Sequence, residues 1–196
     1  MKNLILSALV LIGGISIAKA QNEVKVKVNV NLKNFQSIQI GSGAQSPETG
    51  YDDVVTLNYN DAKDYREGVY KLVNNQLKVS SVGTGYKVTA KISSVKLNRS
   101  SSVGSENIPS NEILQIAVGK SLSNDNKGDR KGVDIGGIDM FINNPSSGQA
   151  SVLDEELDVK YYGKPISQNK LKDYFNNTNN QPIAYWVAVL YQVVPN

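Results

Sequence analysis

The feature that most constrains this chain is a strict alternation of apolar and polar residues in its first part. From Glu23 to Leu32 every second residue is apolar, and the residues between them are lysine or asparagine. The apolar positions are Val24, Val26, Val28, Val30 and Leu32. Residues two apart lie on the same face of a β-strand, whereas a helix would spread them around its axis. The pattern therefore predicts a strand with one apolar face.

Similar stretches recur along the rest of the chain. Phe35, Ile38 and Ile40 extend the first strand as far as Gly41-Ser42-Gly43, where the chain breaks, and further strands are predicted at 54–59, 76–82, 86–97, 138–142 and 150–162, with a last one at 183–194. Gly83-Thr84-Gly85 separates two of them and is typical of a β-hairpin connection. The segment 183–194 is apolar on both faces, so it is predicted to be buried on both sides, with Trp186 in the core.

Four segments do not follow the strand pattern clearly. Residues 111–118 are predicted to be a strand because strands surround them, although Ser110 could also cap a helix there. Residues 61–68 fit either a helical turn or an irregular edge segment. Residues 121–137 are predicted to be a loop, and the polar insert 163–181 has room for one or two helical turns. Several short strands without a long amphipathic helix predict an all-β protein, an antiparallel β-sandwich or barrel formed by residues 21–196 as a single domain.

The N-terminus has the features of an export signal. A short basic start is followed by an apolar run of about 14 residues, and Ala18-Lys19-Ala20 then provides a cleavage site before Gln21. A membrane-spanning helix needs about 20 apolar residues, which argues against an anchor. Residues 1–20 are therefore predicted to be a signal peptide, with Ala18 and Ala20 as the cleavage residues. The mature protein is expected to be periplasmic or on the cell surface, without membrane insertion.

Composition excludes several classes of function. The chain has no histidine and no cysteine, which excludes a Ser-His-Asp triad, a thiolate nucleophile, a zinc finger and disulfides. Without Lys2 and Lys19 of the signal peptide, 19 basic residues face 18 acidic ones. This near-neutral balance gives no electrostatic basis for binding nucleic acid. No cofactor is expected.

Acidic side chains are the remaining candidates for catalysis or metal binding. Asp154 and Glu156 would share one face of a strand, and a carboxylate pair could serve glycoside hydrolysis, but a solvated turn explains the cluster better. Residues 124–129 are rich in oxygen ligands, yet lysine, arginine or aspartate occupies positions that an EF-hand reserves for other residues. The protein is accordingly predicted not to be an enzyme and to hold no metal, with calcium binding at residues 125–134 the one alternative left open.

Aromatic residues offer a weak binding site. The chain has ten tyrosines and one tryptophan, and aromatic faces stack well on sugar rings. Tyr161 and Tyr162 lie near the predicted end of a strand and are the better exposed candidates for glycan binding.

The order of several motifs resembles that of a known class of proteins. The alternating N-terminus is followed by Val54-Val55-Thr56-Leu57, by Asp64 to Val69, by Leu77 to Ser81 and by Gly85 to Lys91; Gly163-Lys164-Pro165 and the segment from Ala184 to Val194 come last. In this order the chain resembles exported pilin-like β-sandwich proteins, which include fimbrial subunits. It departs from them in the insert 166–181, and Trp186-Val187-Ala188 differs from the Trp-x-Leu motif of wall-binding relatives. The resemblance implies an immunoglobulin-like or pilin-like fold and a structural or adhesive role at the cell surface.

The segment after the cleavage site leads to two hypotheses. Residues 23–32 are either an ordinary first strand of their own domain or a donor strand that completes the sheet of a neighbouring subunit. In strand addition, main-chain hydrogen bonds provide affinity and alternate side chains enter pockets. The partners would then be further copies or other surface subunits. A carbohydrate-binding module with a glycan partner is the alternative function.

Overall fold

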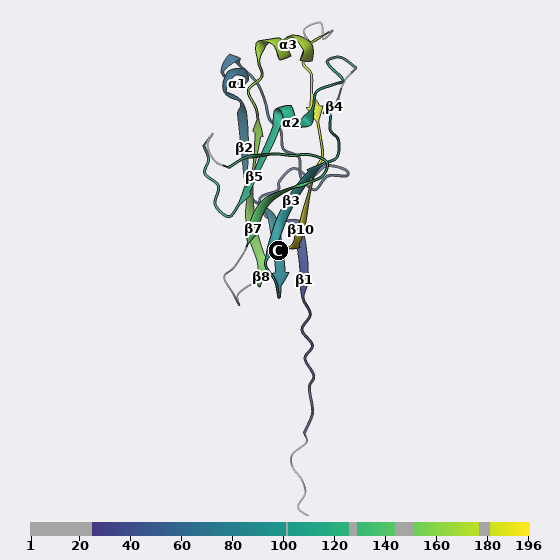
Figure 1. The fold of residues 1–196 in the computed structure, drawn as a ribbon, viewed down its shortest axis with the longest axis vertical. Coiled ribbons are helices and arrows are strands. Elements are labelled where there is room, and N and C mark those ends of the chain that lie inside the picture. Colours follow the sequence, from purple (N-terminus) through teal and green to yellow (C-terminus); the bar gives the residue numbers. More distant parts are fainter. Residues whose placement is uncertain (1–24, 101, 126–128, 144–150, 177–180) are drawn as a thin grey trace, which may run out of the picture. The chain divides into compact units, whose positions relative to one another are not determined.

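The structure, a computed structural model, describes residues 25–100, 102–125, 129–143, 151–176 and 181–196 (Figure 1). The chain divides into two units, residues 1–32 and residues 33–196. The strands of the second unit are β1 (Phe35–Ile40), β2 (Val69–Val82), β3 (Tyr86–Ile92), β4 (Asn98–Arg99), β5 (Leu114–Gly119), β6 (Lys131–Gly132), β7 (Ile138–Asn143), β8 (Val152–Gly163), β9 (Tyr185–Trp186) and β10 (Val189–Pro195). Its described helices are short: α1 (Ala62–Glu67), α2 (Ser110–Ile113) and α3 (Gln168–Tyr174).

The strands form antiparallel sheets, as the alternating patterns predict. The larger sheet has the order β1-β2-β8-β5-β6, and a smaller sheet has the order β10-β3-β7. The two-residue strands β4 and β9 pair with each other. The five-stranded and the three-stranded sheet, which are the two larger sheets of the molecule, share one hydrophobic core. Val79, Ile116 and Val159 of the first sheet and Val88 and Ala90 of the second belong to it. The prediction of an all-β fold is confirmed.

The connection between β2 and β3 differs from the prediction. The two strands belong to different sheets, so Gly83-Thr84-Gly85 carries the chain from one sheet to the other and does not close a hairpin. Stacked sheets lie about 10 Å apart, and three residues can span that distance. Gly83 has a φ of 87°, a conformation that glycine adopts without strain. A short glycine-containing link is thus compatible with both topologies, and the sequence pattern alone does not distinguish them.

The ambiguous segments become regular structure. Asp61 caps α1 with its side chain, and Asp64 completes a capping box, so residues 61–68 contain a helical turn. Both alternatives for residues 110–118 occur in succession, because α2 ends at Ile113 and β5 begins at Leu114. Helix α3 occupies the predicted polar insert. The predicted loop 121–137 contains β6 and the buried Val133.

Two predicted strands at the start of the chain are not regular strands in the structure. Residues 25–34 and 54–59 belong to no strand. In the second segment Val55 and Leu57 nevertheless pack against the core while Thr56 is exposed, so the alternation remains without a ladder of hydrogen bonds. Alternation predicts which residues share a face, whereas a strand also needs a neighbouring backbone.

The prediction for the last segment is also wrong in part. Residues 183–194 form two strands, β9 and β10, which pair with β4 and β3 respectively. Leu190 and Trp186 are 45% exposed, so the segment is not buried on both faces and Trp186 is not a core residue. None of the described helices is long and apolar enough to cross a membrane.

Candidate functional site

The alternating N-terminal segment presents its apolar side chains to solvent. Val26, Val28 and Val30 are 76–77% exposed and Leu32 is 91% exposed. Val24 and the proposed cleavage residues Ala18 and Ala20 lie outside the described residues. A single exposed aliphatic residue is ordinary in a protein, but a row of them at strand spacing is typical of an interaction segment.

Tyr161 and Tyr162 are buried, so the predicted exposure of these two rings is wrong. They are 8% and 1% exposed respectively. Their strand, β8, lies between β2 and β5 in the middle of the larger sheet, and successive side chains therefore point to opposite faces that are both covered. The ring of Tyr162 lies 4.5 Å from the guanidinium carbon of Arg130. Neither tyrosine offers a free face to a sugar.

The hydroxyl group of Tyr161 belongs to a hydrogen-bonded chain between the two larger sheets. It donates to the side-chain oxygen of Gln76 at 2.9 Å and accepts from the Tyr191 hydroxyl at 3.0 Å. Gln76 in turn donates to Asp53 at 2.7 Å. Burial raises the pKa of Tyr161 to about 12, and burial together with Tyr161 raises the pKa of Tyr191 well above its ordinary value. The two phenols are therefore neutral hydrogen-bonding groups near neutral pH.

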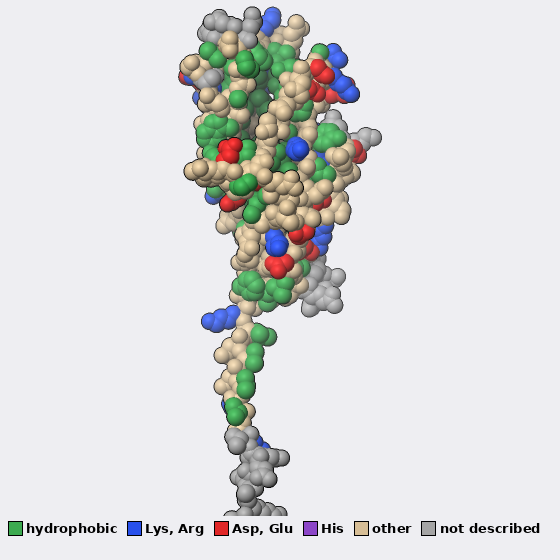
Figure 2. Space-filling view, turned by 180° about the vertical axis from the view of Figure 1, so that it is seen from behind, with side chains coloured by type: hydrophobic (Ala, Val, Ile, Leu, Met, Phe, Trp, Pro, Cys, Tyr) green, Lys and Arg blue, Asp and Glu red, His purple; other side chains and the backbone are tan. Residues whose placement is uncertain are grey.

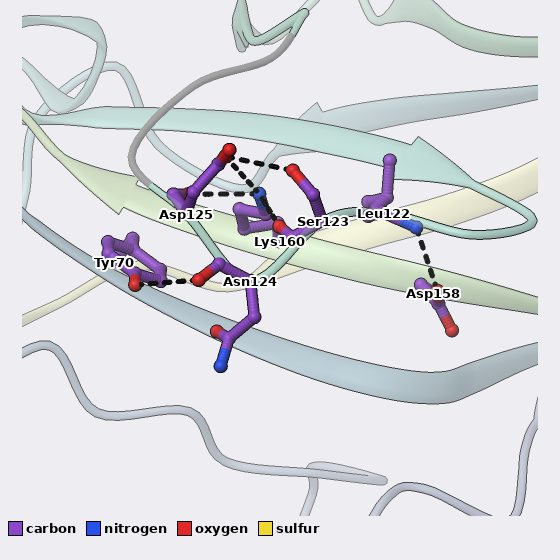
Figure 3. Close-up of polar contacts among 7 residues, drawn as sticks. All are labelled: Tyr70, Leu122, Ser123, Asn124, Asp125, Asp158 and Lys160. Carbon is purple, nitrogen blue, oxygen red and sulfur yellow. Dashed lines mark hydrogen bonds and ion pairs between the residues drawn. The ribbon is translucent and has the colours of Figure 1, made fainter.

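A buried lysine lies on the other face of β8 (Figure 3). The Lys160 side chain is 2% exposed, and its Nζ donates to the backbone oxygens of Ser123 and, at 3.1 Å, of Asp125. The same nitrogen is 3.9 Å from the Asp125 carboxylate and 5.8 Å and 5.5 Å from the ring centroids of Tyr70 and Tyr162. These contacts give a buried cation the partners that it requires.

The neighbouring Asp158 holds the same loop from its other side. Its carboxylate accepts from the backbone N–H of Leu122 at 3.0 Å and from that of Asn75 at 2.9 Å. Asp158 and Lys160 are two residues apart on β8 and therefore share a face. Together the two side chains bind residues 122–125 to β8 through backbone hydrogen bonds. The arrangement is best explained as structural.

The acidic residues considered for hydrolysis or calcium binding have other partners. Asp154 contacts Ser80, Glu156 accepts from Ser42 at 3.0 Å, and Glu155 pairs with Lys120 and accepts from the Tyr86 hydroxyl. In the loop 125–134, the carboxylate of Asp134 accepts from the Gly136 N–H at 2.8 Å. No group of three or more possible metal ligands occurs among the described residues.

The described residues form a large groove that the sequence patterns did not predict. It has a volume of about 1250 Å³ and is lined by β1, residues 48–60, β10 and the end of α3. Hydrophobic side chains border a hollow near the α3 end of the molecule, which is the upper end in Figure 2. The groove is large enough for a peptide strand or an oligosaccharide.

Two aromatic rings stand at this groove. Tyr51 and Trp186 are 40% and 45% exposed, and their ring centroids are 6.1 Å apart at an interplanar angle of 74°. Edge-to-face packing of this kind holds both rings in place while leaving part of each face open. Tyr51 comes from a loop and Trp186 from β9, so only the fold brings them together. The single tryptophan of the sequence is a recognisable candidate for ligand binding, but its contact with Tyr51 cannot be predicted from the sequence.

No protein-family profile matches the chain, and no curated protein is significantly similar to it.

Proposed function

We propose that this protein is an exported structural or adhesive surface subunit with a pilin-like β-sandwich fold, which assembles with its neighbours by strand addition. Residues 24–32 of one copy are the added strand. The protein has no catalytic role in this proposal. Its export rests on the N-terminal signal, and its assembly rests on the residues that follow the cleavage site.

The observation that carries the proposal is the exposed apolar face of residues 25–32. Four aliphatic side chains alternate with lysine and asparagine, all four are more than three-quarters exposed, and the segment belongs to no strand. Burying one such side chain contributes roughly 1.5–3 kcal/mol. Five of them, with Val24, are enough to form a long-lived joint even after the cost of ordering the segment.

The acceptor in this proposal is the edge of β10, which forms no ladder on its second side among the described strands although it lies close to β1. Among the described strands β10 pairs with β3 alone, and with seven residues it is the longest strand at a sheet edge. Val189, Leu190 and Tyr191 of this strand also line the groove. A strand added beside β10 would gain main-chain hydrogen bonds and place alternate side chains in the groove, which are the two requirements of strand addition.

The test compares residues 21–196 with residues 34–196. The shorter chain keeps every described strand, because β1 begins at Phe35. We expect it to fold and remain monomeric in sedimentation velocity, while the longer chain forms oligomers as its concentration rises. A synthetic peptide of residues 21–33 should bind the shorter chain in calorimetry.

A pair of matched substitutions distinguishes strand addition from nonspecific hydrophobic association. Val28→Asp places a charge on the apolar face and should abolish assembly, whereas Asn29→Asp places the same charge on the polar face and should leave it intact. The proposal fails if the longer chain stays monomeric at all concentrations, if the shorter chain unfolds, or if both substitutions act equally.

A further inference from the structure

We infer that Tyr51 and Trp186 form a binding platform for a neutral oligosaccharide at the groove. This inference rests on Tyr51, Trp186 and the carboxylates beside them, whereas the proposed strand addition rests on residues 25–32, although both ligands would occupy the same groove. The platform combines an aromatic pair, a concave surface and unpaired acidic side chains in one place.

The aromatic pair provides the stacking surface. A sugar ring presents an apolar face of C–H groups, and an indole or phenol face packs against it with a gain from burial. The two rings come from segments 135 residues apart, yet their edge-to-face contact at 6.1 Å fixes their mutual orientation before any ligand binds. A preorganised surface loses less entropy on binding than a flexible one does.

The carboxylates beside the two rings can accept hydrogen bonds from the hydroxyl groups of a sugar. Glu48 lies opposite Tyr51 in an antiparallel bridge, and Asp52 is the next residue along the chain. Both are exposed at the groove, and neither side chain makes a hydrogen bond or ion pair with any of the described residues. A carboxylate accepts strong hydrogen bonds from hydroxyl donors, and a sugar provides several at close spacing.

The same carboxylates restrict the class of ligand. Two negative charges at the rim disfavour phosphate, nucleic acid and acidic polysaccharides. A neutral chain of hexoses satisfies both the stacking surface and the acceptors. The competing occupant is the lysine-bearing segment 21–33 of another copy, whose charges also complement this rim.

Trp186 makes the test direct, because it is the one tryptophan in the sequence and its fluorescence reports on the platform alone. The full chain without its first 20 residues is titrated with neutral hexasaccharides of β-1,4-linked glucose, β-1,4-linked N-acetylglucosamine and α-1,6-linked mannose, with hexagalacturonate as the anionic comparison. We expect a saturable change in Trp186 emission with at least one neutral sugar and none with hexagalacturonate.

Substitutions then locate the site. Tyr51→Ala should weaken the affinity for the responding sugar by about tenfold or more, a loss measurable in the same titration. Tyr70→Ala removes a comparably exposed tyrosine outside the groove lining and should leave the affinity unchanged. Trp186→Ala, followed by calorimetry, should abolish binding, with circular dichroism confirming that each variant is folded.

Three results would overturn the inference. The first is the absence of a saturable response to any neutral hexasaccharide at millimolar concentration. The second is an equal effect of Tyr51→Ala and Tyr70→Ala. The third is a response to the peptide of residues 21–33 without a response to any sugar, which would assign the rings to subunit contact.

Discussion

At the scale of single residues, buried hydrogen bonds join the two main sheets in addition to the hydrophobic core that these sheets share. Tyr161 on β8 and Tyr191 on β10 join the two larger sheets through their hydroxyl groups. Gln76 and Asp53 continue this chain of hydrogen bonds. A fully satisfied buried network favours one relative placement of its members, because any other leaves a polar group without a partner.

This network predicts a loss of stability at high pH. The tyrosines ionise near pH 10 in the unfolded chain, whereas burial keeps Tyr161 protonated until about pH 12 in the folded one. Between these values the unfolded state has lost the proton, so the free energy of unfolding falls as the pH rises. Each such tyrosine contributes a fall of up to about 1.4 kcal/mol per pH unit.

The variant Tyr161→Phe separates the two roles of the hydroxyl group. At pH 8 it should unfold more easily by about 1–3 kcal/mol, because Gln76 loses its buried partner. Between pH 10 and pH 12 its stability should fall less steeply than that of the unmodified protein. Urea unfolding at pH 8 and pH 11 measures both effects, and equal slopes would show that Tyr161 does not remain protonated.

Lys160 leads to a second prediction at this scale. Lys160→Met keeps most of the packing volume but removes the hydrogen bonds to Ser123 and Asp125. Hydrogen bonds to a charged group are worth about 1.5–3 kcal/mol. Amide hydrogen exchange in residues 121–125 should therefore accelerate by roughly 10- to 150-fold. The exposed Lys172→Met is the matched control, and unchanged exchange in the Lys160 variant would mean that the loop is held by other contacts.

At the scale of elements, close backbone contacts determine where strands end. β1 is followed by Gly41-Ser42-Gly43, which the sequence predicts as a break in the strand. The structure adds the reason, since Gly41 and Gly43 donate from their N–H groups to the backbone oxygens of Gln76 and Asn75 at 2.7 Å and 3.0 Å. The chain there passes over an irregularity in β2, between Val73 and Leu77.

The contact predicts a strong effect of a single methyl group. A Cβ atom at Gly43 would lie 1.6 Å from the backbone oxygen of Asn74, whereas one at Gly132 would meet nothing within 4 Å. Gly43→Ala should therefore destabilise the protein by about 1–3 kcal/mol or more, since backbone must move to relieve the clash. Gly132→Ala should change the urea midpoint little. Similar midpoints for both variants would contradict the geometry at Gly43.

The sequence predicted most strands but not their neighbours. The patterns at 76–82 and 138–142 lie within β2 and β7, and the pattern at 150–162 overlaps β8 from Val152 onward, because each buries one apolar face in the core. The link after β2 and the pairing of β9 with β4 depend on contacts between distant residues, which local periodicity does not encode. The prediction that Trp186 lies in the core is wrong for the same reason. It rests on the apolar neighbours Ala184, Ala188 and Leu190, whereas the strand of Trp186 lines the groove.

At the scale of the whole molecule, the sequence predicted an all-β protein correctly, and the candidate site only in part. Composition excluded the chemistry of histidine and cysteine, and alternation indicated residues 24–32 as a candidate interaction segment. The groove was not predictable, because it is assembled from β1, β10, α3 and the irregular segment 48–60. Only the three-dimensional fold brings these segments to one place.

The proposed signal peptide leads to a separate prediction for the mass of the mature protein. Protein purified from its native host should have the mass of a chain that begins at Gln21, because the small residues at positions 18 and 20 fit the signal peptidase. Intact-mass spectrometry checks this directly. A mass that includes residues 1–20 would contradict export by this signal.

Amide hydrogen exchange at residues 25–32 tests the central claim of strand addition most directly. The measurement follows the chain of residues 21–196 from dilute to concentrated solution. Strand addition predicts rapid exchange in the dilute monomer and strong protection once subunits assemble, because the backbone of the segment then forms ladder hydrogen bonds with a neighbouring copy. Protection that is already complete in the monomer, or rapid exchange that persists in the assembled form, would contradict it.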